Sequence, residues 1–578
     1  MTANIRCPEC GFLVREGLEA DTESFSFAVR GDTTPEYHRL LNSNDCPEDL
    51  QDLDVVESVM SQTESCLTRI ESNITRLRAR MKQLETQKAY LAEYLAKNKA
   101  IVSPLRRLPP ELLLEIFSWT LPSILTVRRH GSLNLAESPW ALSRVCSRWR
   151  AVALSSPFLW SLIAVNYGGL GYEDVSPYPA SMLQAQLSRS RAQNLRIHFY
   201  GSEQYTPAPQ RQLFMLLTSP AQSTRLEELS LSVTCRLLPL LVNLENESFP
   251  KLRRLYLQWD AAHSRQRPTA QQLIRSFETA PTLADVGIFH EHYYVPVHLP
   301  VRQLTRYSID GPWDMHRHIL RHARFGLVEA RVDVRFGVVP PPGPREEEDV
   351  IELPALRRLY IKHSAVVLDY LRTPSLEEVA LCCPKGEKFE AYATSLQALV
   401  ARSRCPLRRL CITGNFNAED TVKVLHAVPS VKELAVIVDS YSARTEAEHL
   451  LICLTPPLHD EDVSNDGCEI GSSGTTTPTL VAAAHLTTIS LGCDNGTRVA
   501  FELFHSMLRA RWDSDDCALH TAKLFVDSEV GMSTKKHPHR EVLLDLYALR
   551  DEGMELDMRE GSEAGEAMGG WTFGSLWN

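Results

Sequence analysis

Apolar residues between positions 53 and 95 recur at alternating intervals of three and four. The two apolar positions of this heptad repeat hold Leu53, Val56, Met60, Leu67, Ile70, Ile74, Leu77, Met81, Leu84, Leu91 and Leu95, interrupted by Thr63 and Lys88. The pattern predicts a coiled-coil helix over residues 53–100. Because one helix cannot bury such a seam alone, two interpretations stay open: homodimerisation, and a helix folded back on the rest of the chain. Pro104 is expected to end the helix.

A second apolar pattern occupies residues 103–163. Pro109 and Pro110 suit the first turn of a helix, and the next apolar residues fall on one helical face. An irregular insert between Trp119 and Pro139 precedes a second expected helix over residues 140–154. Pro157 ends that helix, and Phe158-Leu-Trp160 starts a third piece. These sixty or so residues form a thin core, so part of their apolar surface is expected to meet a partner.

This stretch resembles an F-box of the F-box-like branch. The resemblance is carried by Leu108-Pro109-x-Glu111-Leu112-x-x-x-Ile116-Phe117, Leu142-x-x-Val145-Cys146-x-x-Trp149-Arg150 and Pro157-x-Leu159-Trp160. It implies a small helical bundle that docks on a Skp-type adaptor, which holds a cullin and a RING subunit. The implied adaptor-binding residues are Leu108, Pro109, Pro110, Leu112, Leu113, Ile116, Phe117, Leu142, Val145, Trp149, Leu159 and Trp160. The alternative is that these residues only form internal core, and for most of them both roles are compatible.

From about residue 192 a shorter motif recurs: apolar-x-x-apolar-x-apolar. Its clear copies are Leu226–Leu231, Leu252–Leu257, Leu283–Ile288, Leu304–Ile309, Leu356–Ile361, Leu376–Leu381, Leu407–Ile412, Val431–Val436 and Leu486–Leu491, and its weaker copies are Ala192–Ile197, Leu327–Val332 and Thr521–Val526. A spacing of mostly about 20 to 35 positions is typical of a solenoid, and the motif resembles a degenerate leucine-rich repeat. The intervening residues 269–279, 392–403 and 418–427 have helical patterns, so each repeat is expected to pair a strand with a helix.

The predicted fold class is therefore α/β. A leucine-rich-repeat-like solenoid over residues 190–545, a curved parallel sheet with outer helices, follows the coiled-coil helix and the F-box-like unit. Residues 1–52 are polar and expected to be largely disordered, as are residues 455–479, and 340–349 form a proline and charge loop. The acidic, glycine-rich tail 550–578 is expected to be mobile, unless Trp571, Phe573, Leu576 and Trp577 dock.

Residues that alternate with the buried motif positions should face out of the sheet. One column holds mixed charges: Glu228, Arg254, Asp285, Arg306, Arg358, Glu378, Arg409 and Glu433. They predict either a cross-strand ladder or a solvated, charge-balanced face, and the mixed sign argues against nucleic-acid binding. The next column places Tyr256, Tyr360 and Phe525 on the concave face, as anchors for a target protein or as residues covered by a loop.

Composition adds little to these patterns. The chain has 578 residues, is 44% hydrophobic and 23% charged, and carries a net charge of −11, which suits a soluble protein of several domains and gives no nucleic-acid footprint. No apolar run is long enough to span a membrane, and no secretory signal is evident. The 14 cysteines have no framework spacing, which favours a reducing, intracellular compartment, cytoplasmic or nuclear.

Candidate chemistry is sparse. Cys7-Pro-Glu-Cys10 resembles half of a zinc ribbon, with Cys46 and His38 as the only later ligand candidates, and unmodified thiols are the alternative. His290-Glu-His292, His537-Pro-His539 and Cys382-Cys383 are poor metal sites, and no phosphate loop or catalytic pattern is present. We therefore expect no cofactor, no metal and no catalytic residue. The expected function is a substrate-recognition subunit of a Skp/cullin/F-box ubiquitin ligase; the alternative is a non-ligase scaffold whose helical unit caps the solenoid.

Overall fold

The protein is described here from a computed structural model. It describes residues 4–6, 13–15, 35–44, 46, 50–122, 131–167, 178–246, 249–260, 273–290, 293–337, 349–456, 482–494, 501–527 and 540–573. The chain forms two compact units, Met1–Pro109 and Pro110–Asn578, which we treat separately. Cys7, Cys10, most of the 455–479 stretch, nearly all of the 340–349 loop, His537, His539, Leu576 and Trp577 lie outside the described residues.

The first unit is dominated by one long helix, α2 (Leu50–Ile101). It covers the predicted 53–100 stretch without a break and ends before Pro104, where a 3-10 turn, η1 (Pro104–Arg106), follows. Residues 1–52, which are predicted to be largely disordered, contain some regular structure in their described part. A short helix, α1 (Pro35–Asn42), and an antiparallel strand pair, β1 (Asn4–Arg6) with β2 (Leu13–Arg15), lie within them.

In its described residues, the second unit begins with four short helical pieces. They are α3 (Pro110–Trp119), α5 (Leu142–Val145), α6 (Ser147–Ser155) and the 3-10 turn η2 (Pro157–Trp160). The single helix expected over residues 140–154 is therefore two helices. Cys146 breaks it: its backbone is extended, with φ −157° and ψ 171°, and its thiol accepts a hydrogen bond from the Trp149 amide as the N-cap of α6.

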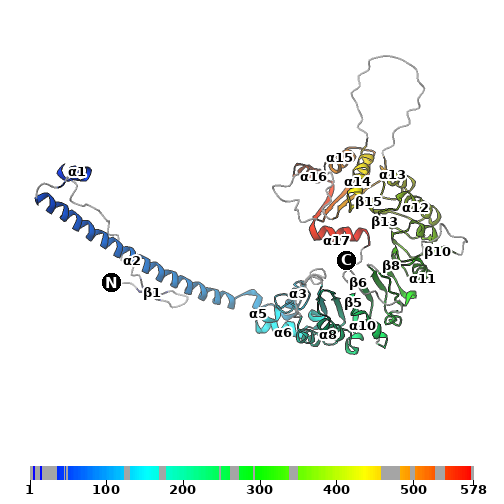
Figure 1. The fold of residues 1–578 in the computed structure, drawn as a ribbon, viewed down its shortest axis with the longest axis horizontal. Helices are drawn as coiled ribbons and strands as arrows, with labels where there is room; N and C mark the ends of the chain where they lie inside the picture. The colour runs from blue at the N-terminus through cyan, green and yellow to red at the C-terminus, as the bar shows by residue number, and fades with distance from the viewer. Residues whose placement is uncertain are drawn as a thin grey trace, which may run out of the picture. The chain divides into compact units, whose positions relative to one another are not determined.

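A 14-stranded sheet fills the rest of this unit, with every strand parallel to its neighbours and in chain order. Its strands are β3 (Leu162–Asn166), β4 (Leu195–Tyr200), β5 (Leu226–Thr234), β6 (Arg254–Asp260), β7 (Asp285–His290), β8 (Arg306–Gly311), β9 (Glu329–Val334), β11 (Arg358–Lys362), β13 (Glu378–Cys383), β14 (Arg409–Gly414), β15 (Glu433–Val438), β16 (Thr488–Cys493), β17 (Thr521–Val526) and β18 (Glu555–Glu560). Figure 1 shows these strands following one another along an arc. The predicted α/β, solenoid-like parallel sheet is confirmed.

The register of the sheet follows the repeat motif. The middle apolar residue of one copy pairs with that of the next, as in Leu229 with Leu255 and Leu410 with Leu434. These side chains are almost fully buried because they face the outer helices. The sheet is longer than the predicted 190–545. Leu162–Asn166 adds a strand at one end, and Glu555–Glu560 adds another within the tail that was expected to be mobile.

Helices connect most of the strands. They are α7 (Ala180–Arg189), α8 (Pro207–Leu217), α9 (Pro220–Ser223), α10 (Leu238–Val242), η3 (Asn243–Asn246), η4 (Val301–Gln303), α11 (Trp313–Ala323), η6 (Ala365–Tyr370), α12 (Phe389–Ser403), α13 (Ala418–Ala427), α14 (Tyr441–Leu454), α15 (Phe501–Trp512), α16 (Arg540–Asp551) and α17 (Gly561–Trp571), with a two-stranded sheet of β10 (Ile351–Glu352) and β12 (Leu371–Arg372) beside them. The helices predicted over 392–403 and 418–427 are confirmed. The one predicted over 269–279 is wrong in its described part, where Ile274 makes an isolated bridge and a turn follows.

Both edges of the sheet are protected against further pairing. At β3, the Ser132 amide donates to the Ala164 carbonyl at 2.8 Å, and the Ala164 amide donates to the Ser132 hydroxyl at 2.8 Å. At the other edge, β18 carries the charged residues Glu555, Asp557, Arg559 and Glu560. Charges on an edge strand disfavour pairing with another chain. The insert before Trp140 thus seals one end of the solenoid.

Candidate binding surfaces

The helical unit has an aromatic core. Leu113 and Phe117 of α3 are fully buried, and the Phe117 ring lies 4.9 Å from the Trp149 ring of α6. Trp160 is also fully buried, and its indole nitrogen donates to the Ala153 carbonyl at 2.8 Å. This core fixes α3 against α6.

The same core joins the helical unit to the first repeat. The Arg189 guanidinium of α7 lies 4.6 Å from the Trp140 ring and 4.4 Å from the Trp160 ring. Burial lowers the pKa of Arg189. Trp140 and Trp160 stand edge to face at 5.1 Å, so the cation stacks against a rigid aromatic pair. The unit therefore packs on the sheet as a fixed cap.

The outer face of α3 remains open. Leu112, Ile116 and Trp119 occupy helical positions i, i+4 and i+7, and their side chains are 52%, 38% and 78% exposed. Val145 and Phe158 add exposures of 60% and 47%. We call Leu112, Ile116 and Trp119 the α3 ridge. Exposed apolar residues grouped in this way mark an interaction surface more reliably than scattered ones do.

The twelve residues predicted for adaptor binding divide into three groups by exposure. Leu113, Phe117, Leu142, Leu159 and Trp160 are buried, Leu108 and Trp149 are half-buried, and Pro109, Pro110, Leu112, Ile116 and Val145 are exposed. The buried ones serve the core and are not open to a partner. Trp119 and Phe158 are exposed apolar residues of the same unit that the prediction does not include. The i, i+4, i+7 spacing from Leu112 would have found Trp119.

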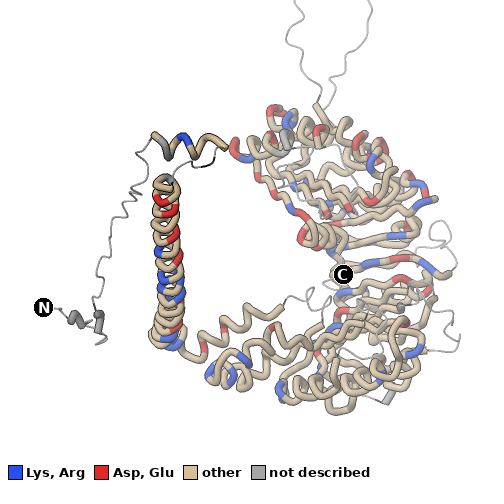
Figure 2. Tube along the Cα trace, turned by 60° about the vertical axis from the view of Figure 1, so that its left-hand side comes forward, with Lys and Arg blue, Asp and Glu red and all other residues tan. Residues whose placement is uncertain are grey.

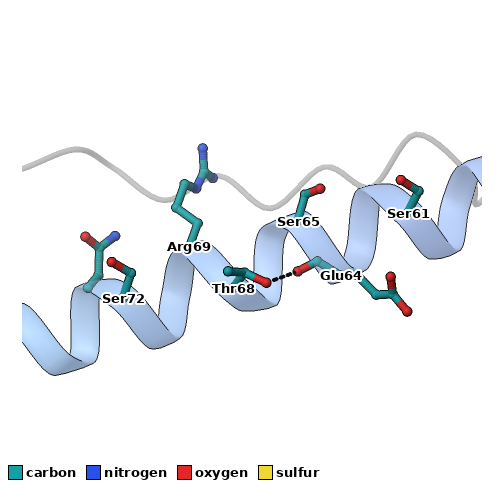
Figure 3. A pocket seen from close by; sticks show the side chains of 7 residues that line it. Ser61, Glu64, Ser65, Thr68, Arg69 and Ser72 are labelled. Atoms are coloured by element: carbon teal, nitrogen blue, oxygen red, sulfur yellow. Dashed lines mark hydrogen bonds between the residues drawn. The ribbon is translucent and has the colours of Figure 1, made fainter.

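The apolar seam of α2 is open in the single chain. Leu67, Ile74, Leu77 and Met81 are between 41% and 64% exposed, as are most of the other heptad residues. Charges of both signs are spread along the helix (Figure 2). Its polar side is seen in Figure 3, where Ser61, Ser65, Arg69 and Ser72 line a hollow and the Thr68 hydroxyl donates to the Glu64 carbonyl.

On the sheet, the outward column of charges forms a ladder. The register places Arg196, Glu228, Arg254, Asp285, Arg306, Glu329, Arg358, Glu378, Arg409 and Glu433 side by side, with alternating sign. Arg306 lies 3.0 Å from Glu329 and 3.7 Å from Asp285, and Arg358 lies 3.2 Å from Glu329. Of the two interpretations left open by the sequence, these ion pairs favour the cross-strand ladder, and Glu329 fills the one gap in the predicted set.

At the β4–β6 end of this ladder, the carboxylate of Glu228 is buried. His198 Nε2 lies 3.3 Å from Glu228 Oε1, and Arg254 lies 3.5 Å from Glu228 Oε2. Burial raises the pKa of Glu228. The hydrogen bond from His198 and the charges of His198, Arg254 and Arg196 together lower the pKa by more, so its net shift is downward. The carboxylate is therefore held ionised as part of the sheet and is not poised as an acid.

Of the two interpretations of Tyr256, Tyr360 and Phe525, open anchors or covered residues, the structure shows covered residues. Their exposures are 3%, 3% and 2%. Tyr256 packs beside Phe289, at 5.3 Å between rings, and Tyr360 lies under the Arg331 guanidinium at 4.3 Å. Phe525 also belongs to a different column. It pairs with Gly492, whereas Lys523 stands beside Ser490.

A cluster of polar side chains lies at the ends of β7 to β11. Asp310 accepts hydrogen bonds from the His290 amide at 2.7 Å, contacts His290 Nδ1 at 2.8 Å, and lies 3.3 Å from Arg335. His290 Nε2 is 3.1 Å from the Val295 carbonyl, so both ring nitrogens have protein partners. In the described parts of the chain, no group of three or more His, Cys, Asp or Glu residues is arranged to hold a metal ion. This cluster ties neighbouring strands together.

His316 on α11 lies under this cluster and is fully buried. Burial lowers its pKa from 6.5 to about 4, although the Asp333 carbonyl, 3.2 Å from Nε2, and nearby carboxylates oppose the shift. The imidazole is therefore neutral at physiological pH.

The search for membrane-spanning helices and the comparisons with known proteins assign no function to the chain. None of the helices that the structure describes is long and apolar enough to cross a membrane. No protein-family model matches the chain, and no match was found among curated proteins.

Proposed function

We propose that this protein is a non-catalytic recognition subunit of a Skp/cullin/F-box ubiquitin ligase. The helical unit binds a Skp-type adaptor, and the solenoid binds the protein to be modified. The chain would then act by tethering, because a target held beside the ligase meets the ubiquitin-charged enzyme at a high effective concentration.

The α3 ridge is the observation that carries this proposal. A helical unit whose sequence resembles an F-box keeps Leu112, Ile116 and Trp119 open while its own core is complete without them. These residues are not needed to hold α3 against α6, because Phe117 and Trp149 already do so. Large apolar side chains left outside a finished core are expected to be buried by a partner.

The second candidate function is a scaffold without a ligase. It is favoured by the hydrogen bonds between Ser132 and Ala164 and by the stacking of Arg189 on Trp140 and Trp160, which make the helical unit a cap of the sheet. Capping accounts for the buried residues of the unit. It does not account for the α3 ridge, which points away from that core.

Adaptor retention separates the two functions. Leu112→Glu with Ile116→Glu should abolish retention of a purified Skp-type adaptor by the full chain, at least a hundred-fold in Kd, because two charges would be desolvated at the interface. The matched control is Met215→Glu with Ile452→Glu, which alters residues of α8 and α14 that are 59% and 55% exposed and lie outside the ridge. Wild type that retains no adaptor, or a ridge variant that retains it as the control does, would refute the ligase function.

A further inference from the structure

The C-terminal helix α17 lies on the face of the sheet opposite to the connecting helices. In Figure 1 it runs inside the arc of strands, whereas α12 to α15 lie outside. Its residues form one buried cluster with outward-facing residues of five strands. The cluster consists of Tyr360, Ala380, Cys411, Ala435, Ile437, Phe525, Ala564, Met568, Trp571 and Phe573. The chain thus covers the part of the concave face that carried two of the predicted target-binding residues.

The contact is made by one stripe of α17. Ala564, Met568 and Trp571 stand at positions i, i+4 and i+7 and are 0%, 4% and 5% exposed. The Trp571 ring stacks on Phe525 with 4.8 Å between centroids and 17° between planes. This spacing of anchors is the one by which an amphipathic helix binds a groove on another protein.

The strand residues beneath α17, which form the floor of the contact, include small residues that leave room for Met568 and Trp571. A Cβ atom on Gly492 of β16 would lie 2.4 Å from the Met568 sulfur and 2.9 Å from the Trp571 ring. Ile437 and Phe525 flank Gly492 in the register, and the next row of the floor, Ala380, Cys411 and Ala435, is made of small residues. A glycine inside a strand weakens the strand and marks a site where another group approaches closely. The sheet is therefore shaped for a helix at this place.

Helix α17 has a low intrinsic helix stability. Gly565 has a packing reason, because a Cβ there would lie 2.9 Å from Asp527. Gly569 and Gly570 have none, since a Cβ at either would meet no atom within 4 Å. Glycine destabilises a helix relative to alanine, and α17 also has no side-chain N-cap hydrogen bond. Alanine would fit and would strengthen the helix, so its docked state is weaker than the groove allows.

We propose that the concave strip beneath α17 is a helix-binding groove and that α17 is its displaceable resident. The partner that fits is an amphipathic helix with a small residue, a methionine-sized residue and an aromatic residue at i, i+4 and i+7. Target binding then competes with α17, and the glycines set how easily α17 leaves. The assignment of this partner helix to the ligase target rests on the function proposed above; the groove and its occupant do not.

The test uses the full chain and a fluorescent peptide with the sequence of residues 560–573 as the probe, without adaptor. Met568→Ala with Trp571→Ala leaves the floor intact and frees it, so the peptide should bind this variant at least ten-fold more tightly than wild type. Gly569→Ala with Gly570→Ala should lock the resident helix and weaken peptide binding by about five- to thirty-fold relative to wild type. A peptide carrying Trp571→Ala should bind none of the three.

Equal binding of the peptide to all three chains, or to none, would overturn the proposal. Hydrogen exchange of the wild-type chain provides the second measurement, should the freed variant fail to fold. The amides of α17 should exchange at least ten-fold faster than those of β15 to β17. Equal protection would show that α17 opens only with the sheet and is a permanent part of it. Failure of either arm leaves adaptor retention through the α3 ridge unaffected, so the two proposals fail separately.

Discussion

The α3 ridge and the concave strip of the sheet both carry apolar side chains that lie outside the main core, but only one is covered. Leu112, Ile116 and Trp119 are open, while Tyr360 and Phe525 lie under Arg331 and Trp571. The resemblance to an F-box predicts the first surface, whereas side-chain direction along the strands predicts the second. Direction determines which face a residue occupies, whereas exposure also depends on whether a distant part of the chain returns to cover it.

The difference has an energetic meaning. A covered apolar residue contributes to folding, so its removal should destabilise the chain. An open one contributes little to folding and is available for binding, so its removal should act on partners alone. Variants of covered and of open residues therefore test this distinction.

The largest effect on stability should come from the core of the helical unit. Phe117→Ala should lower the free energy of unfolding by about 3 to 5 kcal/mol, because it removes a fully buried ring packed on Trp149. Leu112→Ala, one turn away on the ridge, should change it by less than about 0.5 kcal/mol. Urea unfolding followed by tryptophan fluorescence measures both. Similar losses for the two variants would mean that the ridge belongs to the core.

The seam of α2 is a second open surface, for which we expect homodimerisation. Leu67→Glu with Ile74→Glu should weaken the dimer at least a hundred-fold, about 3 kcal/mol, because it places charges in a buried seam. Ser65→Glu with Ser72→Glu adds the same charge on the polar side of the helix (Figure 3) and should leave the dimer intact. Sedimentation equilibrium distinguishes the two. A wild-type monomer would exclude this mode of association.

Acid should lower the stability of the folded chain through the fully buried His316 of α11. The pKa of His316 is about 4 in the folded chain and about 6.5 when unfolded, so the unfolded chain takes up the proton first as the pH falls. Stability is therefore full above pH 6.5 and is lost as the pH falls toward 4, by about 2 kcal/mol at pH 5. His316→Gln should reduce this slope in urea unfolding between pH 7 and pH 5. An unchanged slope would assign the acid response to other groups.

The charge ladder should have the smallest effect. Arg306 is about one-third exposed and pairs with Asp285 and Glu329, but Glu329 keeps Arg358 as a second partner. Arg306→Gln should therefore cost about 1 kcal/mol or less. Repeating the unfolding in 1 M salt should remove only part of the difference, because the carboxylates of Asp285 and Glu329 are largely buried and such pairs are screened less than exposed ones. A loss of several kcal/mol would show that the ladder acts as one cooperative network.

Periodicity predicted the repeating elements well because each one is local. The strand motif reports burial within six residues, and the register that follows places Leu229 beside Leu255 as expected. The alternation of charge even anticipated the ladder, because neighbouring strands repeat the same positions. The long helix is likewise readable from its heptads, although its association with a second copy remains a prediction.

The features that the sequence did not predict depend on contacts between residues far apart in the chain. The tail looked mobile because Gly561–Gly570 is rich in glycine and charge, yet it contributes a strand and a helix, and Trp571 and Phe573 dock as the alternative allowed. The cover on Phe525 comes from a residue nearly fifty positions later, which no local pattern reports. Trp119 was missed for the opposite reason: its signal is local, but an insert was expected to begin there.

The central claim is that the α3 ridge binds the adaptor while the concave strip stays closed. Hydrogen exchange of the full chain, with and without a purified Skp-type adaptor, tests it most directly. The account predicts new protection in α3 and in the segment from Leu142 to Trp160, with the exchange of α17 and β17 unchanged. Protection confined to the concave face, or no protection in α3, would contradict it.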